Sequence, residues 1–298
     1  MKKYLALSRT THAVLDIALP GFCALLWLGR FPQWSILLLA LIAVFAGYTA
    51  IYALNDLVGF QMDREKFSGG INAGYSVEAS ELRYPLARDV LSYRGGWLWF
   101  IFWFAIALFG AYLLNPAILI ILVAAAILEI VYCILLKVTY LRVVVSGLVK
   151  SAGPIAAVFT VDHHPSPYLL LLIVVWVFFW EIGGQNIPAD WNDTVEDLRV
   201  NAKTIPIQFG TQKAGLIVVV ALGLAVITSI FLPVASPLAL GLPYVLVSVL
   251  VGIFLLVKPG YRLYRHHHEG RLAARLFDHA SYYPLAQLAI LSIFVIIR

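Results

Sequence analysis

The sequence predicts an all-α, polytopic membrane protein, and three observations lead to this fold class. Hydrophobic residues make up 62% of the 298 residues, charged residues only 12%, and the mean hydropathy is +0.89. Apolar runs long enough to cross about 30 Å of hydrocarbon as helices recur along the whole chain. No long polar insertion separates them. Because a segment in lipid must satisfy its own backbone hydrogen bonds, we predict that these runs are helices.

Proline, glycine and charged residues divide the apolar sequence into nine predicted helices. In chain order, such residues mark breaks at about 30–33, 58–96, 115–116, 137–142, 162–167, 188–213, 234–237 and 258–279. The predicted helices therefore cover about residues 13–29, 34–57, 97–114, 117–136, 143–161, 168–187, 214–233, 238–257 and 280–297. We predict a single domain, residues 1–298, with two cap loops at about 58–96 and 188–213.

The basic residues indicate how the helices are oriented. Of the 21 Lys and Arg residues, 18 fall at the N-terminus or in alternate segments between helices. Lys150, in the predicted helix 143–161, is counted with the segment before it, which makes 19, and only Arg30 and Arg298 fall on the other side. Since Lys and Arg are enriched in cytoplasmic loops, we predict that the N-terminus and both cap loops are cytoplasmic. The net charge is +5, but the distribution of the basic residues among alternate loops is that of a topology signal, which argues against a nucleic-acid partner. Cys23 and Cys133 lie inside apolar runs, so neither a disulfide framework nor a thiolate metal site is expected.

Two clusters of acidic residues follow the second and sixth predicted helices. The first acidic motif, "NDLVGFQMD", covers residues 55–63, and the second, "DWNDTVED", covers residues 190–197. At about 100° per residue, a helix aligns Asp56 with Asp63 and leaves Asn55 about 80° from Asp63. If the sixth helix continues through its motif, one stripe contains Asn186, Asp190, Asp193 and Asp197. Both clusters lie on the predicted cytoplasmic side, where they can face each other.

Stacked carboxylates repel one another, and a divalent cation relieves that repulsion. Magnesium prefers one or two carboxylates together with phosphate oxygens. Basic residues adjoin both motifs: Arg64 and Lys66 follow the first, and Arg199 and Lys203 follow the second. An alternative interpretation is that these charges have no ligand and only keep the helix ends hydrated at the membrane surface. Two clusters with adjoining bases instead favour a magnesium-bound diphosphate.

The motifs resemble those of the UbiA-type intramembrane prenyltransferases, which join an isoprenyl diphosphate to an acceptor that is usually aromatic. The family patterns N-D-x-x-D-x-x-x-D and D-x-x-D-x-x-x-D are similar to "NDLVGFQMD" and "DWNDTVED". Segments "LSRTTH", "VYCILLKVTYLRVVVSG", "NAKTIPIQFG" and "ARLFDHASYYPLA" also resemble family segments. Two departures stand out: Gly59 replaces the middle Asp of the first motif, and Asn201 replaces a Gly after the second.

The resemblance implies nine helices around a central cavity with a side opening to lipid. It implies Mg²⁺-dependent transfer of an isoprenyl group to a lipophilic acceptor, through ionisation to an allylic cation. The candidate metal ligands are Asn55, Asp56, Asp63, Asp190, Asp193 and Asp197. The candidate catalytic residues are Asp63, Asp190, Asp197, Tyr132 and Lys203. The candidate substrate-binding residues are Arg9, Asn55, Arg64, Lys66, Lys137, Asn186 and Arg199.

Each candidate has an expected role. The basic residues stabilise the departing diphosphate, because cations placed where charge develops assist the chemical step. Tyr132 and Arg9 match residues that the family keeps, and the Tyr132 ring is expected to face the allylic cation. Glu129 could orient Tyr132, or form a structural hydrogen bond between helices. Asp16 and Lys150 are intramembrane charges that could pair with each other.

Two functions other than a transferase are also compatible with the sequence. A membrane terpene cyclase would use the same ionisation chemistry, and Gly59 leaves that possibility open. A transporter could hold a polyanionic lipid without reacting with it, although its charged segments would be expected near the bilayer midplane rather than toward one face. A phosphatidyl-type alcohol transferase is disfavoured, because its D-G-x-x-A-R signature is missing from the sequence.

Overall fold

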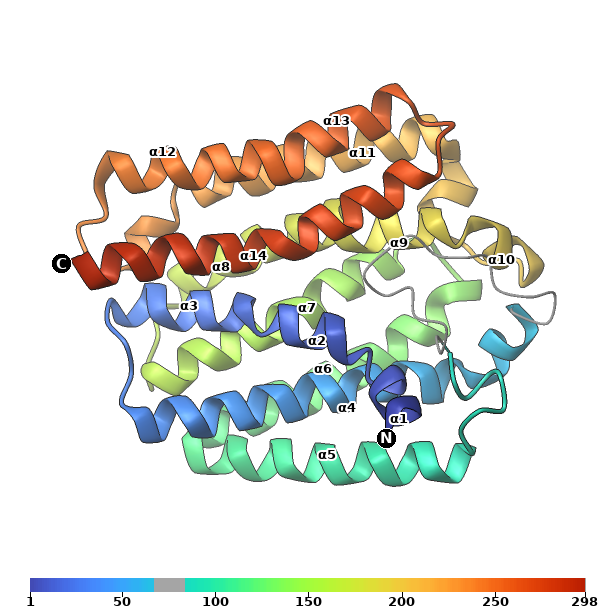
Figure 1. Ribbon diagram of the computed structural model, residues 1–298, viewed down its shortest axis with the longest axis horizontal. Helices are drawn as coiled ribbons and strands as arrows, with labels where there is room; N and C mark the ends of the chain where they lie inside the picture. Colours follow the sequence, from blue (N-terminus) through green and yellow to red (C-terminus); the bar gives the residue numbers. More distant parts are fainter. Residues whose placement is uncertain (67–83, 298) are drawn as a thin grey trace.

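A computed structural model of the chain describes residues 1–66 and 84–297. Within those residues, nine helical segments are long and apolar enough to span a membrane, which confirms the predicted fold class (Figure 1). The candidate spans are Thr10–Leu28, Trp34–Lys66, Tyr93–Leu114, Pro116–Lys137, Arg142–Val161, Pro167–Asn192, Ile205–Ser229, Gly241–Arg265 and Arg271–Ile297.

Several spans are built from more than one helical element. The first half comprises α1 (Lys2–Leu7), α2 (Thr10–Asp16), α3 (Ala18–Leu28), α4 (Trp34–Lys66), α5 (Tyr93–Leu114), α6 (Pro116–Ile134), η1 (Leu135–Lys137) and α7 (Arg142–Val161). The second half comprises α8 (Pro167–Trp180), η2 (Glu181–Asn186), α9 (Ile187–Asn192), α10 (Thr194–Arg199), α11 (Ile205–Ser229), η3 (Leu232–Ala235), α12 (Gly241–Gly252), η4 (Ile253–Val257), α13 (Lys258–Arg265) and α14 (Arg271–Ile297). Helix α11 is kinked at Gly210, where φ is 77° and ψ is 162°.

The predicted helices were too short at one end of the molecule. Helix α4 continues to Lys66, α11 begins at Ile205 and α14 begins at Arg271. Apolar runs mark only the part of a helix that lies in hydrocarbon, whereas polar turns can continue the helix into water. Both predicted cap loops are therefore partly helical, and residues 67–83 of the first lie outside the described residues.

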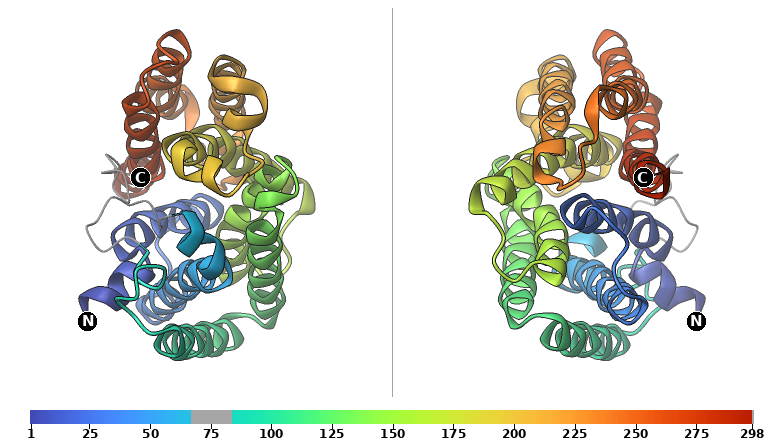
Figure 2. Two further views of the ribbon diagram at one scale, coloured as in Figure 1. Left: turned by 90° about the vertical axis from the view of Figure 1, so that its right-hand side faces the viewer. Right: turned by 90° about the vertical axis from the view of Figure 1, so that its left-hand side faces the viewer.

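The helices run lengthwise through the molecule, and the second half packs beside the first (Figures 1 and 2). Helix α4 packs on α5, α3 packs on α7, and α11 packs on α8 and α13. The largest cluster of buried apolar side chains includes Phe22, Trp176, Leu222 and Tyr283. This cluster joins α3, α8, α11 and α14, so it fixes the second half against the first. The cavity described below lies between α3, α4, α5, α6, α7 and α14.

The π-helical segment η2 depends on two glycines. A Cβ atom on Gly184 would lie 2.7 Å from the Ala280 Cβ, and one on Gly183 would lie 2.9 Å from the Leu222 Cγ. Only glycine permits such a close approach of this turn to α14 and α11. Single π-helical turns are rare and often occur at functional sites. Here η2 presents Glu181, Gln185 and Asn186 to the cavity.

The departure at Asn201 has a backbone explanation. Asn201 has a φ of 54° and follows the end of α10, where the Ala202 N–H donates to the Asp197 carbonyl oxygen over 3.0 Å. A left-handed residue after a helix end is usually Gly and sometimes Asn, because other side chains clash with the backbone there. Asn201 can therefore replace glycine at this position while keeping the same chain path.

We expect Asn201→Val to lower the free energy of unfolding by about 1–2 kcal/mol, because a β-branched residue is strained at positive φ. Asn201→Gly should change it by only a few tenths of a kcal/mol. Asn201 is exposed, so neither substitution removes a packed side chain. Thermal unfolding of both purified variants in one detergent measures the difference. Equal midpoints for the Val and Gly variants would contradict the left-handed assignment.

Candidate active site

The two acidic motifs meet at one end of the molecule, called the motif end below. Figure 1 shows the end of α4 and the elements α9 and α10 together at the same end. The Lys66 Nζ on α4 lies 2.5 Å from the Asp197 Oδ1 on α10, and both side chains are buried. The Lys66 charge also interacts with Asp63 and Asp193. The expectation that the two clusters face each other is therefore confirmed.

Arg9 connects the N-terminus to the first motif. It separates α1 from α2 and adopts a left-handed conformation, with a φ of 45°. Its Nη2 lies 3.3 Å from both the Asn55 Oδ1 and the Asp56 Oδ1 on α4. The Asn55 Nδ2 in turn donates to the Glu129 Oε1 on α6 over 2.5 Å. A non-glycine residue at positive φ is uncommon, and here it accompanies a guanidinium placed on an acidic motif.

Arg142 holds the second motif. Its Nη1 lies 3.1 Å from the Asp190 Oδ1, and its guanidinium lies 3.9 Å from the centre of the Tyr132 ring. The Tyr132 hydroxyl accepts a hydrogen bond from the Asn186 Nδ2 over 2.9 Å. From the sequence, Arg142 was expected only to help to orient the helices in the membrane. Its position directly after the "KVTYL" turn placed it at the motif end, but its partners come from other spans.

The sixth helix does not continue unbroken through the second motif, so the condition for a single stripe of carboxylates is not met. Helix α9 ends at Asn192, and Asp193 has a φ of −95° and a ψ of 12°. The Thr194 hydroxyl donates to the Trp191 carbonyl over 2.7 Å, and such local bonds compete with helical ones. Asp190 and Asp197 are buried, whereas Asp193 is half-buried.

The structure also shows how the first motif accommodates Gly59. A Cβ atom on Gly59 would lie only 3.0 Å from the Asp63 Oδ2, one helical turn later. Helical side chains point back toward the N-terminus, so the Asp63 carboxylate occupies the space that a side chain at position 59 would fill. The Asp63 charge interacts with Lys66, Asp56 and Asp193. The missing side chain therefore allows Asp63 to lie close to the α4 backbone.

Four predicted cationic partners of the diphosphate lie at the surface. Arg64 pairs with Asp89 over 3.2 Å, and its side chain is 59% exposed. Lys137 pairs with Glu65 over 3.0 Å, also at the surface. The Arg199 Nη1 donates to the Lys66 carbonyl over 2.8 Å, which supports Lys66 from outside. Lys203 is exposed as well.

Tyr84 is a further residue at the motif end that was not among the candidate site residues. Its hydroxyl donates to the Asp193 Oδ2 over 3.4 Å, and the Arg9 guanidinium lies 5.8 Å from its ring centre. Tyr84 lies in the segment between α4 and α5, where no periodic pattern indicated a role. It connects the first cap region to the second motif.

A cavity of about 630 Å³ extends from the motif end into the bundle. Its wall is mainly aliphatic, with residues from α3, α4, α5, α6, α7 and α14. Near the motif end the wall includes Arg9, Asn55, Tyr132 and Asn186. An apolar wall of this kind suits a long hydrocarbon chain and excludes water. This agrees with the central cavity that the family resemblance implies.

The donor atoms at the motif end are compatible with magnesium. They are carboxylate and amide oxygens, and the buried Asn186 Oδ1 accepts no hydrogen bond from the part of the chain that the structure describes. Within that same part, no three His, Cys, Asp or Glu side chains converge closely enough to form a metal cage. Magnesium is typically held by one or two carboxylates plus phosphate oxygens, so the residues fit a shared site rather than an all-protein cage.

Comparisons with known proteins agree with this architecture. A digeranylgeranylglyceryl phosphate synthase from Pyrococcus horikoshii is 25% identical over 233 residues, covering 76% of this chain and 77% of the relative. A UbiA homologue from Aeropyrum pernix superposes with a TM-score of 0.71 at 19% identity, covering 96% of this chain and 97% of that one. A UbiA homologue from Archaeoglobus fulgidus, bound to DMAPP and Mg²⁺, superposes with a TM-score of 0.69 at 16% identity, covering 98% of this chain and 99% of the homologue.

The family match covers almost the whole membrane domain. A profile of the UbiA prenyltransferase family matches residues 17–282, which contain both acidic motifs and most of the cavity wall. The profile favours an enzyme over the transporter considered from the sequence. The chain belongs to the UbiA prenyltransferase family and is an integral, multi-pass membrane prenyltransferase.

Proposed function

We propose that this chain catalyses the Mg²⁺-dependent transfer of an isoprenyl group from a prenyl diphosphate to a lipophilic acceptor. One observation carries the proposal: both acidic motifs lie together with three cationic side chains, the buried Lys66 and Arg142 and the half-buried Arg9, at one end of an apolar cavity. The arrangement separates a charged site for the diphosphate from an apolar site for the prenyl chain. The Archaeoglobus fulgidus homologue, which binds DMAPP and Mg²⁺, supports this division.

The residues divide into two groups. Magnesium would be held by the two acidic motifs, and when bound it would offset charge on the diphosphate oxygens. The candidate ligands are Asn55, Asp56, Asp63, Asp190, Asp193 and Asp197, with Asn186 as a further amide oxygen. Lys66, Arg9 and Arg142 are the cations closest to these carboxylates, so we assign them to the diphosphate. Preorganised cations stabilise negative charge that develops as the bond to the prenyl group breaks.

Tyr132 remains the first candidate for contact with the allylic group. It lines the cavity in contact with Asn186 and Arg142, and its hydroxyl accepts a hydrogen bond from Asn186. Arg142 already lies over its ring, so that ring face is satisfied by a side chain of the protein itself. We propose that the ring edge and the neighbouring aliphatic wall exclude water around the allylic group.

We further propose that the motif end faces the cytoplasm, with the N-terminus on the same side. The 19 basic residues assigned to that side support this orientation through the positive-inside rule. Lys150 is one of the 19, but it lies within the predicted helix 143–161 and within α7 of the structure, not in a loop. The remaining 18 still outnumber Arg30 and Arg298 on the opposite side.

The first test is to incubate purified protein with labelled geranylgeranyl diphosphate, with and without Mg²⁺, over a panel of lipophilic acceptors. We expect diphosphate release and a prenylated acceptor only when Mg²⁺ is present, with loss of both on chelation by EDTA. A cyclic hydrocarbon formed without acceptor would instead identify a terpene cyclase. Binding without release under every condition would contradict the proposal.

Gly59→Ala provides a further test of the first motif. The added methyl group would press on the Asp63 carboxylate, so we expect a several-fold higher Mg²⁺ concentration for half-maximal release. The same change should stabilise α4 by about 0.5–1 kcal/mol, because alanine favours helix interiors over glycine. Magnesium titrations and thermal unfolding measure the two effects. A variant with unchanged magnesium dependence would contradict the role given to Asp63.

A further inference from the structure

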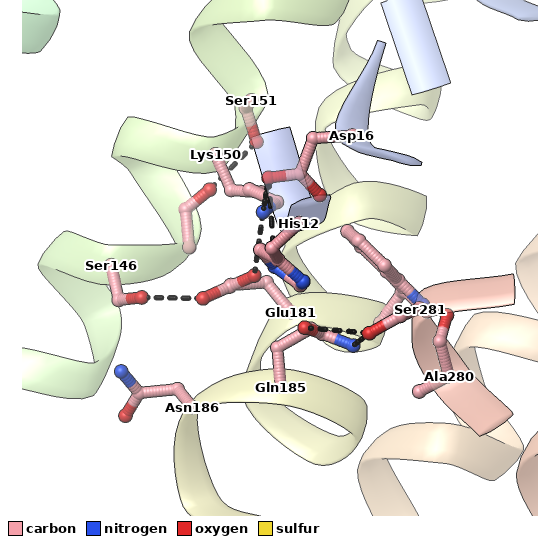
Figure 3. Close-up of polar contacts among 12 residues, drawn as sticks. His12, Asp16, Ser146, Lys150, Ser151, Glu181, Gln185, Asn186, Ala280 and Ser281 are labelled. Carbon is pink, nitrogen blue, oxygen red and sulfur yellow. Dashed lines mark hydrogen bonds and ion pairs between the residues drawn. The ribbon is translucent and has the colours of Figure 1, made fainter. Parts of the chain in front are cut away.

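A second polar cluster lies deeper in the cavity, and the proposed reaction at the motif end does not use it. Lys150 follows Arg142 by eight residues on α7, which places it about 12 Å further along the helix. Its Nζ lies 2.7 Å from the Asp16 Oδ2 and 4.0 Å from the Glu181 Oε2. Figure 3 shows these side chains converging from α2, α7 and η2. Lys150 and Glu181 both line the cavity.

With His12 neutral, the cluster contains two carboxylates, Asp16 and Glu181, and one cation, Lys150. Asp16 accepts hydrogen bonds from Tyr52 and Lys150, and the His12 Nε2 lies 3.6 Å away. Lys150 thus faces two carboxylates, Asp16 and Glu181. Glu129 adds a further carboxyl on the cavity wall toward the motif end. The nearest guanidinium groups, Arg9 and Arg142, are already bound to Asp56 and Asp190.

Two polar atoms on this wall are buried without hydrogen-bond partners among the described residues. The Glu181 Oε1 accepts from Ser146 over 2.7 Å, whereas the Glu181 Oε2 accepts no hydrogen bond from residues 1–66 or 84–297 and has the Lys150 Nζ 4.0 Å away. In the described part of the chain, the Tyr48 hydroxyl likewise has no hydrogen-bond partner. It lies 2.7 Å from the position that a Cβ atom on Gly153 would take, so glycine leaves space for it. Buried polar atoms are normally paired, and unpaired ones on a cavity wall indicate a ligand group.

We propose that Glu181 and Tyr48 form a subsite for the hydroxyl group of an uncharged, lipophilic acceptor. The hydroxyl would donate to the Glu181 Oε2 and accept from the Tyr48 hydroxyl. A carboxylate or phosphate head group would instead face Asp16 and Glu181, and like charges repel strongly in a weakly hydrated cavity. This inference rests on the proposed function, because it assigns the acceptor class of that same reaction.

Binding in the absence of prenyl diphosphate and Mg²⁺ tests the subsite separately from catalysis. The probes are para-nonylphenol, para-nonylbenzoate and nonylbenzene, which share one alkyl chain and differ in head group. Wild-type protein in lipid nanodiscs is titrated with each at neutral pH, and the rise in unfolding temperature gives the apparent affinity. We expect para-nonylphenol to bind most tightly and para-nonylbenzoate most weakly. Equal binding of the three probes, tighter binding of the benzoate, or no binding at all would overturn the inference.

Two variants test the residues themselves. Glu181→Gln keeps the shape but weakens the acceptor, so phenol affinity should fall about tenfold. The substitution also removes a negative charge that repels the benzoate, so the difference in affinity between para-nonylphenol and para-nonylbenzoate should become smaller. A residue with only a structural role would not change this difference. Tyr48→Phe should lower phenol affinity about three- to tenfold. Tyr244→Phe is the matched control, because Tyr244 is buried outside the cavity wall. Wild-type affinity in both Glu181→Gln and Tyr48→Phe would overturn the assignment.

These outcomes are distinct from those of the catalytic test. If prenyl diphosphate is never consumed but the phenol still binds through Glu181, the proposed function fails and the polar subsite stands. If diphosphate is released but benzoates bind and react as well as phenols, the proposed function stands and the acceptor class is wrong.

Discussion

Replacing Asp197 by asparagine is expected to lower the rate of diphosphate release at least about 100-fold, because charged groups preorganised at a reacting site commonly contribute factors of this size. Asp197 is 1% exposed and lies 2.5 Å from the Lys66 Nζ, where α10 meets α4. Asparagine has nearly the same shape but lacks the charge. It would therefore weaken both the candidate magnesium site and the position of Lys66.

The surroundings of Asp197 also predict a pH dependence. Burial raises the pKa of the Asp197 carboxyl, and the neighbouring Lys66 opposes that shift. A raised pKa means that the carboxylate takes up a proton at a higher pH than an exposed aspartate does. Diphosphate release should therefore decline as the pH falls through the pKa of this group. The Asp197→Asn variant, which already resembles the protonated form, should show a flatter acidic limb.

The matched control is Asp162→Asn, the same chemical change at a residue far from the motif end. Asp162 follows the last residue of α7, whereas Arg142 at the start of α7 lies at the motif end. Asp162 accepts hydrogen bonds from the Trp27 Nε1 over 2.8 Å and from the His164 N–H over 2.9 Å. It is remote from the motif end, so release should stay within about twofold of wild type, and any loss should appear in thermal unfolding. An Asp197→Asn protein that keeps more than a tenth of the wild-type rate at saturating Mg²⁺ would defeat the assignment.

The fold was largely predictable because its main determinant is local. A run of about 20 apolar residues must span as a helix whatever its neighbours are, so all nine spans could be located from the sequence. The helix ends were less predictable. Lys66 and Arg265 belong to helices that continue beyond the apolar run, and the hydrophobic pattern gives no signal there.

The site divides in the same way. The two acidic motifs were recognisable from their spacing, and the suggested pairing of Asp16 with Lys150 is confirmed. The partners Arg142 and Tyr84 were missed, because each meets its acid across spans distant in sequence. Arg64 and Lys137 adjoin motif or family segments in sequence but bind surface acids instead. The spacing of the acidic residues in the sequence thus identified the two motifs. Which basic side chains contact these carboxylates depends on tertiary packing.

The pairing of Asp16 with Lys150 leads to the second large expected effect. Replacing Lys150 by methionine should lower the free energy of unfolding by about 3–5 kcal/mol, the usual cost of removing one partner of a buried ion pair. The side chains of Lys150 and Asp16 are 11% and 3% exposed, and Glu181 lies beside them. The variant would leave two buried carboxylates without their cation. Thermal and denaturant unfolding in one detergent measure the loss.

A double variant separates lost charge balance from lost packing. In Lys150→Met/Asp16→Asn one of the two carboxylates is removed as well, while an oxygen remains to accept the Tyr52 hydrogen bond. Because removing both members of a buried ion pair is often nearly neutral, at least half of the lost stability should return. Lys213→Met, on an exposed lysine, should change stability by no more than about 0.5 kcal/mol. If Lys150→Met costs as little as Lys213→Met, the cavity wall is well hydrated, and the repulsion that selects an uncharged acceptor would be too weak to act.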